Sequence, residues 1–167
     1  FGNFLFTGSR FEASTIFNSE DVELKEFNRL TDLSLKGDLN YFPASGHAVE
    51  AGFLSKRMSM EYRFGEADQN WVNVDTEGFH HAFYLQDNWT STSRLTLQPG
   101  LRFSYFTNGK YSGLAPRLAA RYQLGVDTFV KGAVGRYHQY IFRMAREFQG
   151  ISILSNVWTL ADSTAEP

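Results

Sequence analysis

Polar and apolar residues alternate without interruption from residue 94 to residue 105. In an extended chain, one face of this segment carries Leu95, Leu97, Pro99, Leu101, Phe103 and Tyr105. The opposite face carries Arg94, Thr96, Gln98, Gly100, Arg102 and Ser104. Only a β-strand, whose side chains point alternately to two faces, sorts such a sequence into one apolar and one polar surface. Residues 114–124 repeat the pattern, so the two segments predict neighbouring long strands.

The same period of two predicts further strands at residues 2–13, 29–42, 47–64, 79–89 and 128–140. Short turns are expected at 43–46, 90–93, 107–113 (with Asn108-Gly109 as its turn signal) and 125–127, and longer loops at 15–26 and 65–78. Short turns at one end and longer loops at the other are typical of outer membrane barrels. Beyond Leu54 the apolar residues move from odd-numbered to even-numbered positions. Either a β-bulge or an extension of the strand past the bilayer explains this change of parity.

The alternation fails after residue 140. Residues 141–167 are therefore expected to form an extracellular loop with one helical turn near 143–148, and 151–158 is a candidate for the start of a further strand. The domain prediction is a partial transmembrane barrel of about seven strands over residues 1–140, followed by this loop. The fold class is all-β, an antiparallel up-and-down meander forming part of a transmembrane β-barrel.

Composition narrows the function classes. Aromatic residues make up 16% of the chain, yet the mean hydropathy is −0.33, as expected when apolar and polar positions alternate. No run of about 18 apolar residues is present, which excludes a transmembrane helix. The net charge of −2 gives no basic field for nucleic acid, and the absence of cysteine excludes a disulfide framework. His80 and His81 are adjacent and would point to opposite faces, so a metal site is not expected there. No cofactor is expected either.

Four short sequence motifs, in this order along the chain, resemble the middle barrel strands of TonB-dependent receptors, in particular Bacteroidetes-type members. They are YLQDNW at 84–89, RLTLQPGLRFSYF at 94–106, APRLAARYQL at 115–124 and KGAVGRYHQY at 131–140. The resemblance implies a 22-stranded barrel with an N-terminal plug, in the bacterial outer membrane of a Gram-negative cell. It also implies import of a siderophore, cobalamin or oligosaccharide with energy relayed by TonB. The chain is then expected to be a fragment that contacts outer membrane lipid, the plug and the rest of the barrel.

Two sets of residues are candidates for function. Aromatic and histidine side chains in or beside the expected external loops are candidates for ligand contact, namely Trp71, Tyr111, Tyr137, His138 and Tyr140. The second set consists of polar residues that the period-two alternation places on the lumen side. They either contact the substrate or plug, or form ion pairs that stiffen the wall. We favour the ion pairs, since barrel interiors are polar by construction. This set is Asp32, Lys36, Asp38, Glu50, Gln86, Arg102, Arg117, Arg121 and Lys131.

Two alternatives stay open at this point. One is an autonomous eight-stranded outer membrane barrel that uses residues 151–158 as its last strand. The other is a soluble β-sandwich binding module, which strands of ten or more residues disfavour, since strands of globular proteins usually have about five or six. No arrangement of residues suggests nucleophilic catalysis, so the chain is not expected to be an enzyme.

Overall fold

The computed structural model describes residues 1–18, 23–66, 69–148 and 151–161. Among these residues, no helix is long and apolar enough to cross a membrane. The described chain is almost entirely strand, with a single-turn helix η1 (Asn108–Lys110). The strands are β1 (Gly2–Asn18), β2 (Glu23–Tyr41), β3 (His47–Glu66), β4 (Gln69–Thr90), β5 (Leu95–Phe106), β6 (Tyr111–Gln123), β7 (Phe129–Gly135), β8 (Ile141–Phe148) and β9 (Ile151–Leu160).

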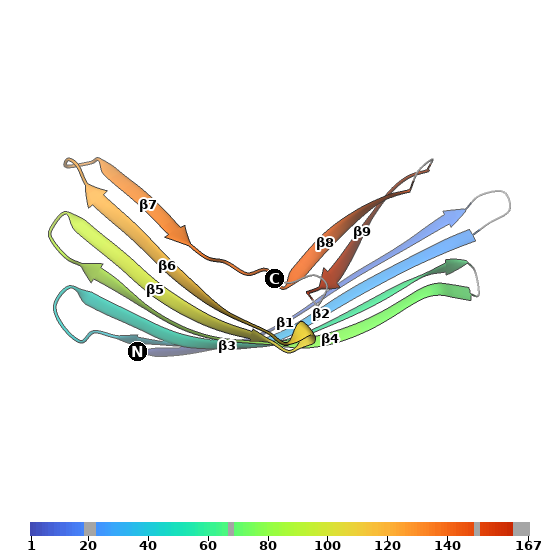
Figure 1. Ribbon diagram of the computed structural model, residues 1–167, viewed down its shortest axis with the longest axis horizontal. Helices are drawn as coiled ribbons and strands as arrows, with labels where there is room; N and C mark the ends of the chain where they lie inside the picture. The colour runs from blue at the N-terminus through green and yellow to red at the C-terminus, as the bar shows by residue number, and fades with distance from the viewer. Residues whose placement is uncertain (19–22, 67–68, 149–150, 162–167) are drawn as a thin grey trace.

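Strands β1 to β7 form one antiparallel sheet in sequence order. The sheet curls into a half-barrel with a concave and a convex side (Figure 1). This confirms the predicted up-and-down meander. Within the described residues β1 and β7 each pair on one side only, so closing a barrel requires further strands at both edges. The eight-stranded alternative is wrong, because β9 pairs with β8 and not with either edge.

The soluble β-sandwich is also wrong, because the convex face of the sheet is apolar and uncovered. Its side chains are large and exposed to the outside, for instance Phe83 at 62%, Leu85 at 56% and Leu118 at 46% exposure. A sandwich buries such a face against a second sheet. Here the apolar face belongs to the side that lipid covers in a transmembrane barrel.

The two predicted long loops are mostly strand. Inside the expected loop at 15–26, β1 extends to Asn18 and β2 begins at Glu23, and β4 begins at Gln69 inside the expected loop at 65–78. Pairing between β3 and β4 is continuous from Phe64 and Val72 down to His47 and Trp89. These segments escaped prediction because their outward positions are polar, as with Asn73, so the expected apolar stripe is missing.

The change of parity in β3 is not a bulge. The ladders to β2 and β4 run without a shift from Val49 to Phe64, and the irregularity lies beyond, between Phe64 and Gly65. Phe53 therefore points to the convex side and Met58 to the concave side of one regular strand. Past this level the convex face carries ion pairs instead of apolar groups, including Arg29–Glu61 at 2.9 Å and Arg57–Glu77 at 2.8 Å. The strand extends beyond the apolar band into water.

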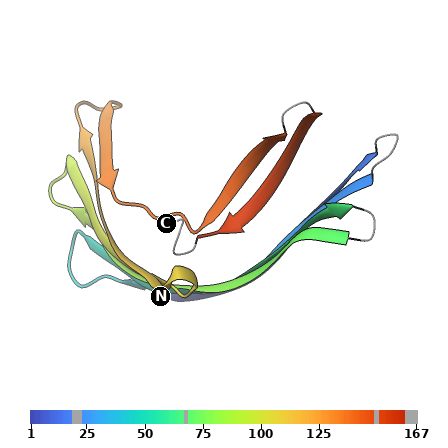
Figure 2. The ribbon, with the colours of Figure 1, turned by 45° about the vertical axis from the view of Figure 1, so that its right-hand side comes forward.

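A second hairpin lies over the concave side of these extended strands. β8 and β9 form a two-stranded sheet of their own, and Figure 2 shows it inside the curve of the half-barrel. The expected helical turn at 143–148 is wrong, whereas the expected strand at 151–158 lies within β9. The predicted strand at 128–140 is too long, because β7 ends at Gly135 and 136–140 is an irregular connection to the hairpin.

The buried core sits where this hairpin meets the wall. Met58 is 1% exposed and Phe106 is 0% exposed, although both lie on the concave side of the half-barrel. The ring of Trp158 contacts Phe11 edge-on, with centroids 6.3 Å apart. The buried cluster consists of Met58, Met60, Tyr62, Phe106, Tyr140, Leu160 and Ala161.

Candidate functional site

Cross-strand register places all nine predicted lumenal residues on the concave face. Directly paired residues of neighbouring strands share a face, and the row Asp38, Gly52, Tyr84, Arg102 runs from β2 to β5. The adjacent row joins Glu50, Gln86, Gly100 and Arg117, and Arg121 pairs with Lys131. We call this surface the lumenal wall.

On strands β2 to β4 the charged residues of the lumenal wall each have a polar partner. Lys36 contacts Asp38 at 2.8 Å, and Lys56 contacts Asp32 at 2.5 Å. The Gln86 amide donates a hydrogen bond to the Glu50 carboxylate at 2.9 Å. This half of the wall has the ion-pair arrangement that the sequence favoured.

On strands β5 to β7 the lumenal charges are all positive. Arg102, Arg117, Arg121 and Lys131 have no carboxylate partner among the described residues. Three of them lie over aromatic rings instead: Arg121 is 3.9 Å from the Phe129 ring, Arg117 is 4.5 Å from Tyr137 and Arg102 is 5.9 Å from Tyr84. The favoured ion-pair network therefore does not extend to this half of the wall.

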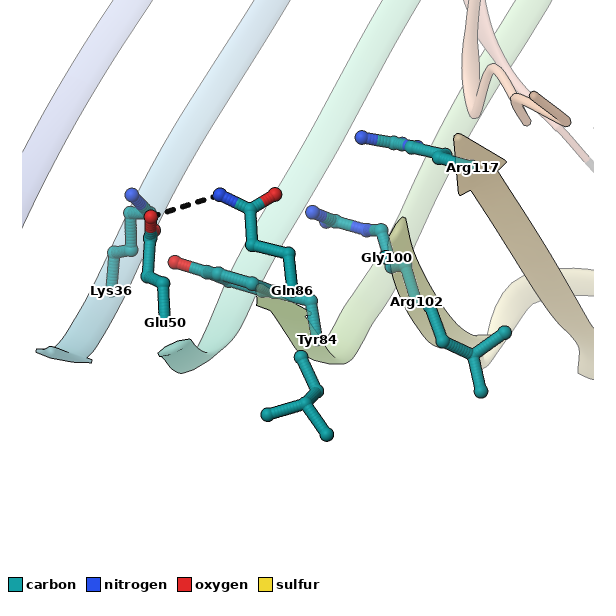
Figure 3. Close-up of a pocket in the computed structure, with 9 residues that line it drawn as sticks. Lys36, Glu50, Tyr84, Gln86, Gly100, Arg102 and Arg117 are labelled. Carbon is teal, nitrogen blue, oxygen red and sulfur yellow. Dashed lines mark hydrogen bonds between the residues drawn. The ribbon is translucent and has the colours of Figure 1, made fainter. Parts of the chain in front are cut away.

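A pocket forms where the two halves meet. Figure 3 shows Arg102 and Arg117 extending in the same direction from adjacent strands, toward Gln86, Glu50 and Lys36. Gly52 allows the Tyr84 ring to lie flat across β3, because a Cβ there would come within 2.5 Å of the Tyr84 ring and hydroxyl. Tyr84 thereby lies between two cations, with the Lys36 ammonium 5.7 Å from its ring on β2 and Arg102 on β5.

Three of the five predicted ligand-contact residues converge under the hairpin. The Tyr111 ring contacts His138 at 5.4 Å and Tyr140 at 6.3 Å between centroids. Tyr140 is 8% exposed and packs against His80 at 4.2 Å. In this conformation Tyr140 is part of the core rather than a free contact surface.

The polar atoms of this aromatic group are not satisfied within the described residues. Nε2 of His80, Nε2 of His138 and the hydroxyl of Tyr140 are buried and make no hydrogen bond there. Burial raises the pKa of the Tyr140 phenol above its ordinary value. Burial and, secondarily, the nearby Arg136 charge lower the pKa of the His138 imidazole. Both side chains are therefore held neutral, which suits an apolar environment.

The other two predicted contact residues lie apart from that group. Trp71 was expected in a loop but belongs to β4, is 53% exposed and contacts Phe64 edge-on at 5.7 Å. Tyr137 is 68% exposed and covers Arg117 at the rim of the lumenal pocket. The five residues therefore do not form one site.

Sequence reasoning missed His80 and the methionines of β3 as parts of this region. His80 was considered only as a metal ligand beside His81, although it is 7% exposed and packs under Tyr140. The signal that identifies them is the parity change beyond Leu54, which turns Met58 and Met60 toward the concave side. An apolar row on the polar side of a barrel implies a covering element.

Comparison with known proteins gives one match. The family model described as TonB dependent receptor-like, beta-barrel matches residues 1–154. No curated protein and no solved structure matches the chain. The matched range includes the whole seven-stranded sheet and β8, and it ends within β9.

Proposed function

The chain belongs to the β-barrel family of TonB-dependent receptors, and we propose that it forms part of the wall and mouth of an outer membrane importer for a scarce nutrient. Siderophores, cobalamin and oligosaccharides are the candidate substrate classes. The proposal assigns the chain a role in binding and passage, with no catalytic step.

The observation that carries the proposal is the division of each spanning strand into a lipid side and a lumen side. On β5 the outward residues Leu101 and Phe103 are 45% and 44% exposed, while Arg102 between them points inward. A charge at the lipid-facing midplane costs about 2–4 kcal/mol, so strict alternation is what a bilayer selects. A cationic lumen behind an apolar exterior suits passage of a polar solute.

The external end supplies the proposed capture surface. There the wall rises above the apolar band and exposes Trp71 on β4, while Tyr137 is exposed at the rim of the lumenal pocket. Aromatic faces bind sugar rings, aromatic groups and cations alike, so they suit several substrate classes. Ligand capture would be followed by movement of the plug, energised through TonB.

Uptake by the bacterium that carries the gene tests the proposal. The receptor gene and the tonB gene are deleted separately, and uptake of a radiolabelled ferric siderophore, cobalamin and an oligosaccharide is measured. We expect uptake of one substrate class to be lost in both deletions, and the receptor gene on a plasmid should restore it in the receptor deletion but not in the tonB deletion. Uptake of all three classes at wild-type rates in the receptor deletion would contradict the proposal.

Cell fractionation tests the location independently. An antibody against the β4 segment 69–78 should detect the receptor in the outer membrane fraction. Detection only in a soluble fraction would contradict the proposed membrane location, whatever the uptake results.

A further inference from the structure

We propose that Arg102 and Arg117 together bind one oxyanion, a carboxylate or a phosphate, on the lumenal wall between β5 and β6. This inference rests on the proposed function only in taking the concave face as the lumen. The anionic group belongs either to the imported solute or to an acidic side chain of the plug, and the experiment below separates these two sources.

The backbone brings the two guanidinium groups together. Arg117 pairs with Gly100 across the ladder, and Arg102 follows two residues later on the same face of β5, opposite Ala115. Neither Gly100 nor Ala115 has a side chain long enough to separate them. Both guanidinium groups extend side by side into the pocket (Figure 3).

The nearby carboxylates are already engaged elsewhere. Asp38 pairs with Lys36 at 2.8 Å, and Glu50 accepts from Gln86 at 2.9 Å. The described partner of Arg102 is the Ser104 hydroxyl, which accepts from its Nε at 3.4 Å. Two like charges side by side destabilise each other, and an anion between them relieves that repulsion.

The aromatic contacts leave the right donors free. Tyr137 covers the face of Arg117 and Tyr84 lies beside Arg102, as described above. Stacking uses the face of a guanidinium group, while its N–H donors lie in the plane and stay available. Two adjacent planar forks match the oxygen spacing of carboxylate and phosphate, which Arg binds bidentately.

The pocket limits what it takes to one anionic group. Its volume is about 190 Å³, equal to roughly six water molecules at ~30 Å³ each. The opposite side of the pocket carries Lys36, which is paired with Asp38, and the Glu50 carboxylate, so the two arginines are its unpaired cations among the described residues. The pocket is open toward the lumen, so it can hold one carboxylate or phosphate group of a larger substrate.

Binding is tested on the full-length receptor in detergent, with inorganic phosphate and citrate as probes at constant ionic strength. Titration calorimetry of the wild type should give saturable binding to at least one probe. The double variant Arg102→Gln/Arg117→Gln should weaken it by about tenfold or more, as loss of charged hydrogen bonds predicts. Arg117→Lys keeps the positive charge but loses the planar guanidinium group that binds two oxygens at once, so it should lose part of the affinity for the probe.

Arg121→Gln is the matched control. Arg121 lies on the same strand and face as Arg117 and also lacks a described carboxylate partner. Its neutralisation should change affinity by less than about twofold, since it removes only a distant charge. An equal loss in Arg121→Gln and the double variant would overturn the paired site in favour of a diffuse positive field.

A plug carboxylate in the site gives a different result. The wild type then binds neither probe, and the double variant releases the plug at lower urea than wild type or Arg121→Gln, seen as ion conductance in planar bilayers. Absence of both probe binding and a shift in plug release overturns the proposal. Neither measurement uses substrate import, so the anion site is tested independently of the proposed transport function.

Discussion

The ring of Tyr140 lies 4.2 Å from the imidazole of His80 and 5.1 Å from the ring of Phe106. These contacts attach the start of the β8–β9 hairpin to the wall. No backbone ladder joins the hairpin to the seven-stranded sheet within the described residues. Elsewhere the hairpin is held by packing and by side-chain hydrogen bonds such as Asn108 Nδ2 to the Ala161 carbonyl at 2.9 Å.

Tyr140→Ala should therefore loosen the hairpin without unfolding the barrel. Removing a buried aromatic ring costs about 3 kcal/mol or more, and here that cost falls on hairpin docking. Hydrogen exchange of the full-length receptor should show faster exchange at 141–160 and unchanged exchange in β2 and β3. Tyr140→Phe is the control, because it keeps the ring that packs on His80 and Phe106 and removes only the hydroxyl. Equal damage from both variants would contradict a packing role.

The same substitution should have opposite consequences at two levels of β4. Leu85 and Asn73 lie on the convex face of one strand, but only Leu85 lies in the apolar band. Leu85→Arg should block assembly, at a cost of about 2–4 kcal/mol near the midplane, whereas Asn73→Arg should assemble normally. Heat-modifiable mobility of receptor from outer membranes reports the difference. Normal assembly of both variants would place Leu85 outside the bilayer.

Gly52→Ala should destabilise the wall because its new methyl group would overlap Tyr84. Overpacking of this kind typically costs about 1–3 kcal/mol, and the displaced ring would disturb Lys36 and Arg102. Gly132→Ala is the control, since a Cβ at that position meets nothing within 4 Å. Urea unfolding followed by tryptophan fluorescence should show a lower midpoint for Gly52→Ala alone. An unchanged midpoint would mean that Tyr84 has free space to move.

Acid should weaken attachment of the 136–140 connection. The pKa of His138 is lowered in the folded protein, first by burial and then by Arg136, so folding favours the neutral ring. The stabilisation is complete above the unfolded pKa of about 6.5. It declines as the pH falls below that value, because only the released state then binds the proton readily.

Limited proteolysis of the receptor at pH 7.5 and pH 5.5 measures this effect. Cleavage near 136–140 should accelerate at the lower pH in the wild type, and the acceleration should be smaller in His138→Gln, in which the buried His80 beneath Tyr140 remains. A wild type equally resistant at both values would show that His138 protonation is not coupled to release.

Period-two alternation was sufficient to predict the spanning part of the sheet. It works between Leu95 and Tyr105 because a bilayer and an aqueous lumen impose opposite demands on successive side chains. It also placed residues as distant as Asp32 and Lys131 on one face. The face to which a strand residue points depends only on its place in the alternation, so predicting it needs no knowledge of tertiary contacts.

The alternation could not predict the external part of the sheet, because its convex side faces water and its concave side is covered by the β8–β9 hairpin. Polar residues at Asn73 and Asp75 resemble a loop in sequence, although they are the outward positions of a strand. Met58 of β3 shares a buried cluster with Leu160 of β9, which the alternation along β3 alone does not reveal. The unpaired state of Arg102 and Arg117 likewise depends on which carboxylates the register brings near, and sequence spacing alone does not report it.

The uninterrupted course of β3 sets the height of the molecule. Its 20 residues, at about 3.3 Å each and tilted by roughly 40°, rise about 50 Å along the barrel axis. The apolar band of such barrels is about 25 Å tall. The rim on this side therefore stands well clear of the lipid headgroups, so an arriving solute meets protein in open solution before it reaches the membrane surface.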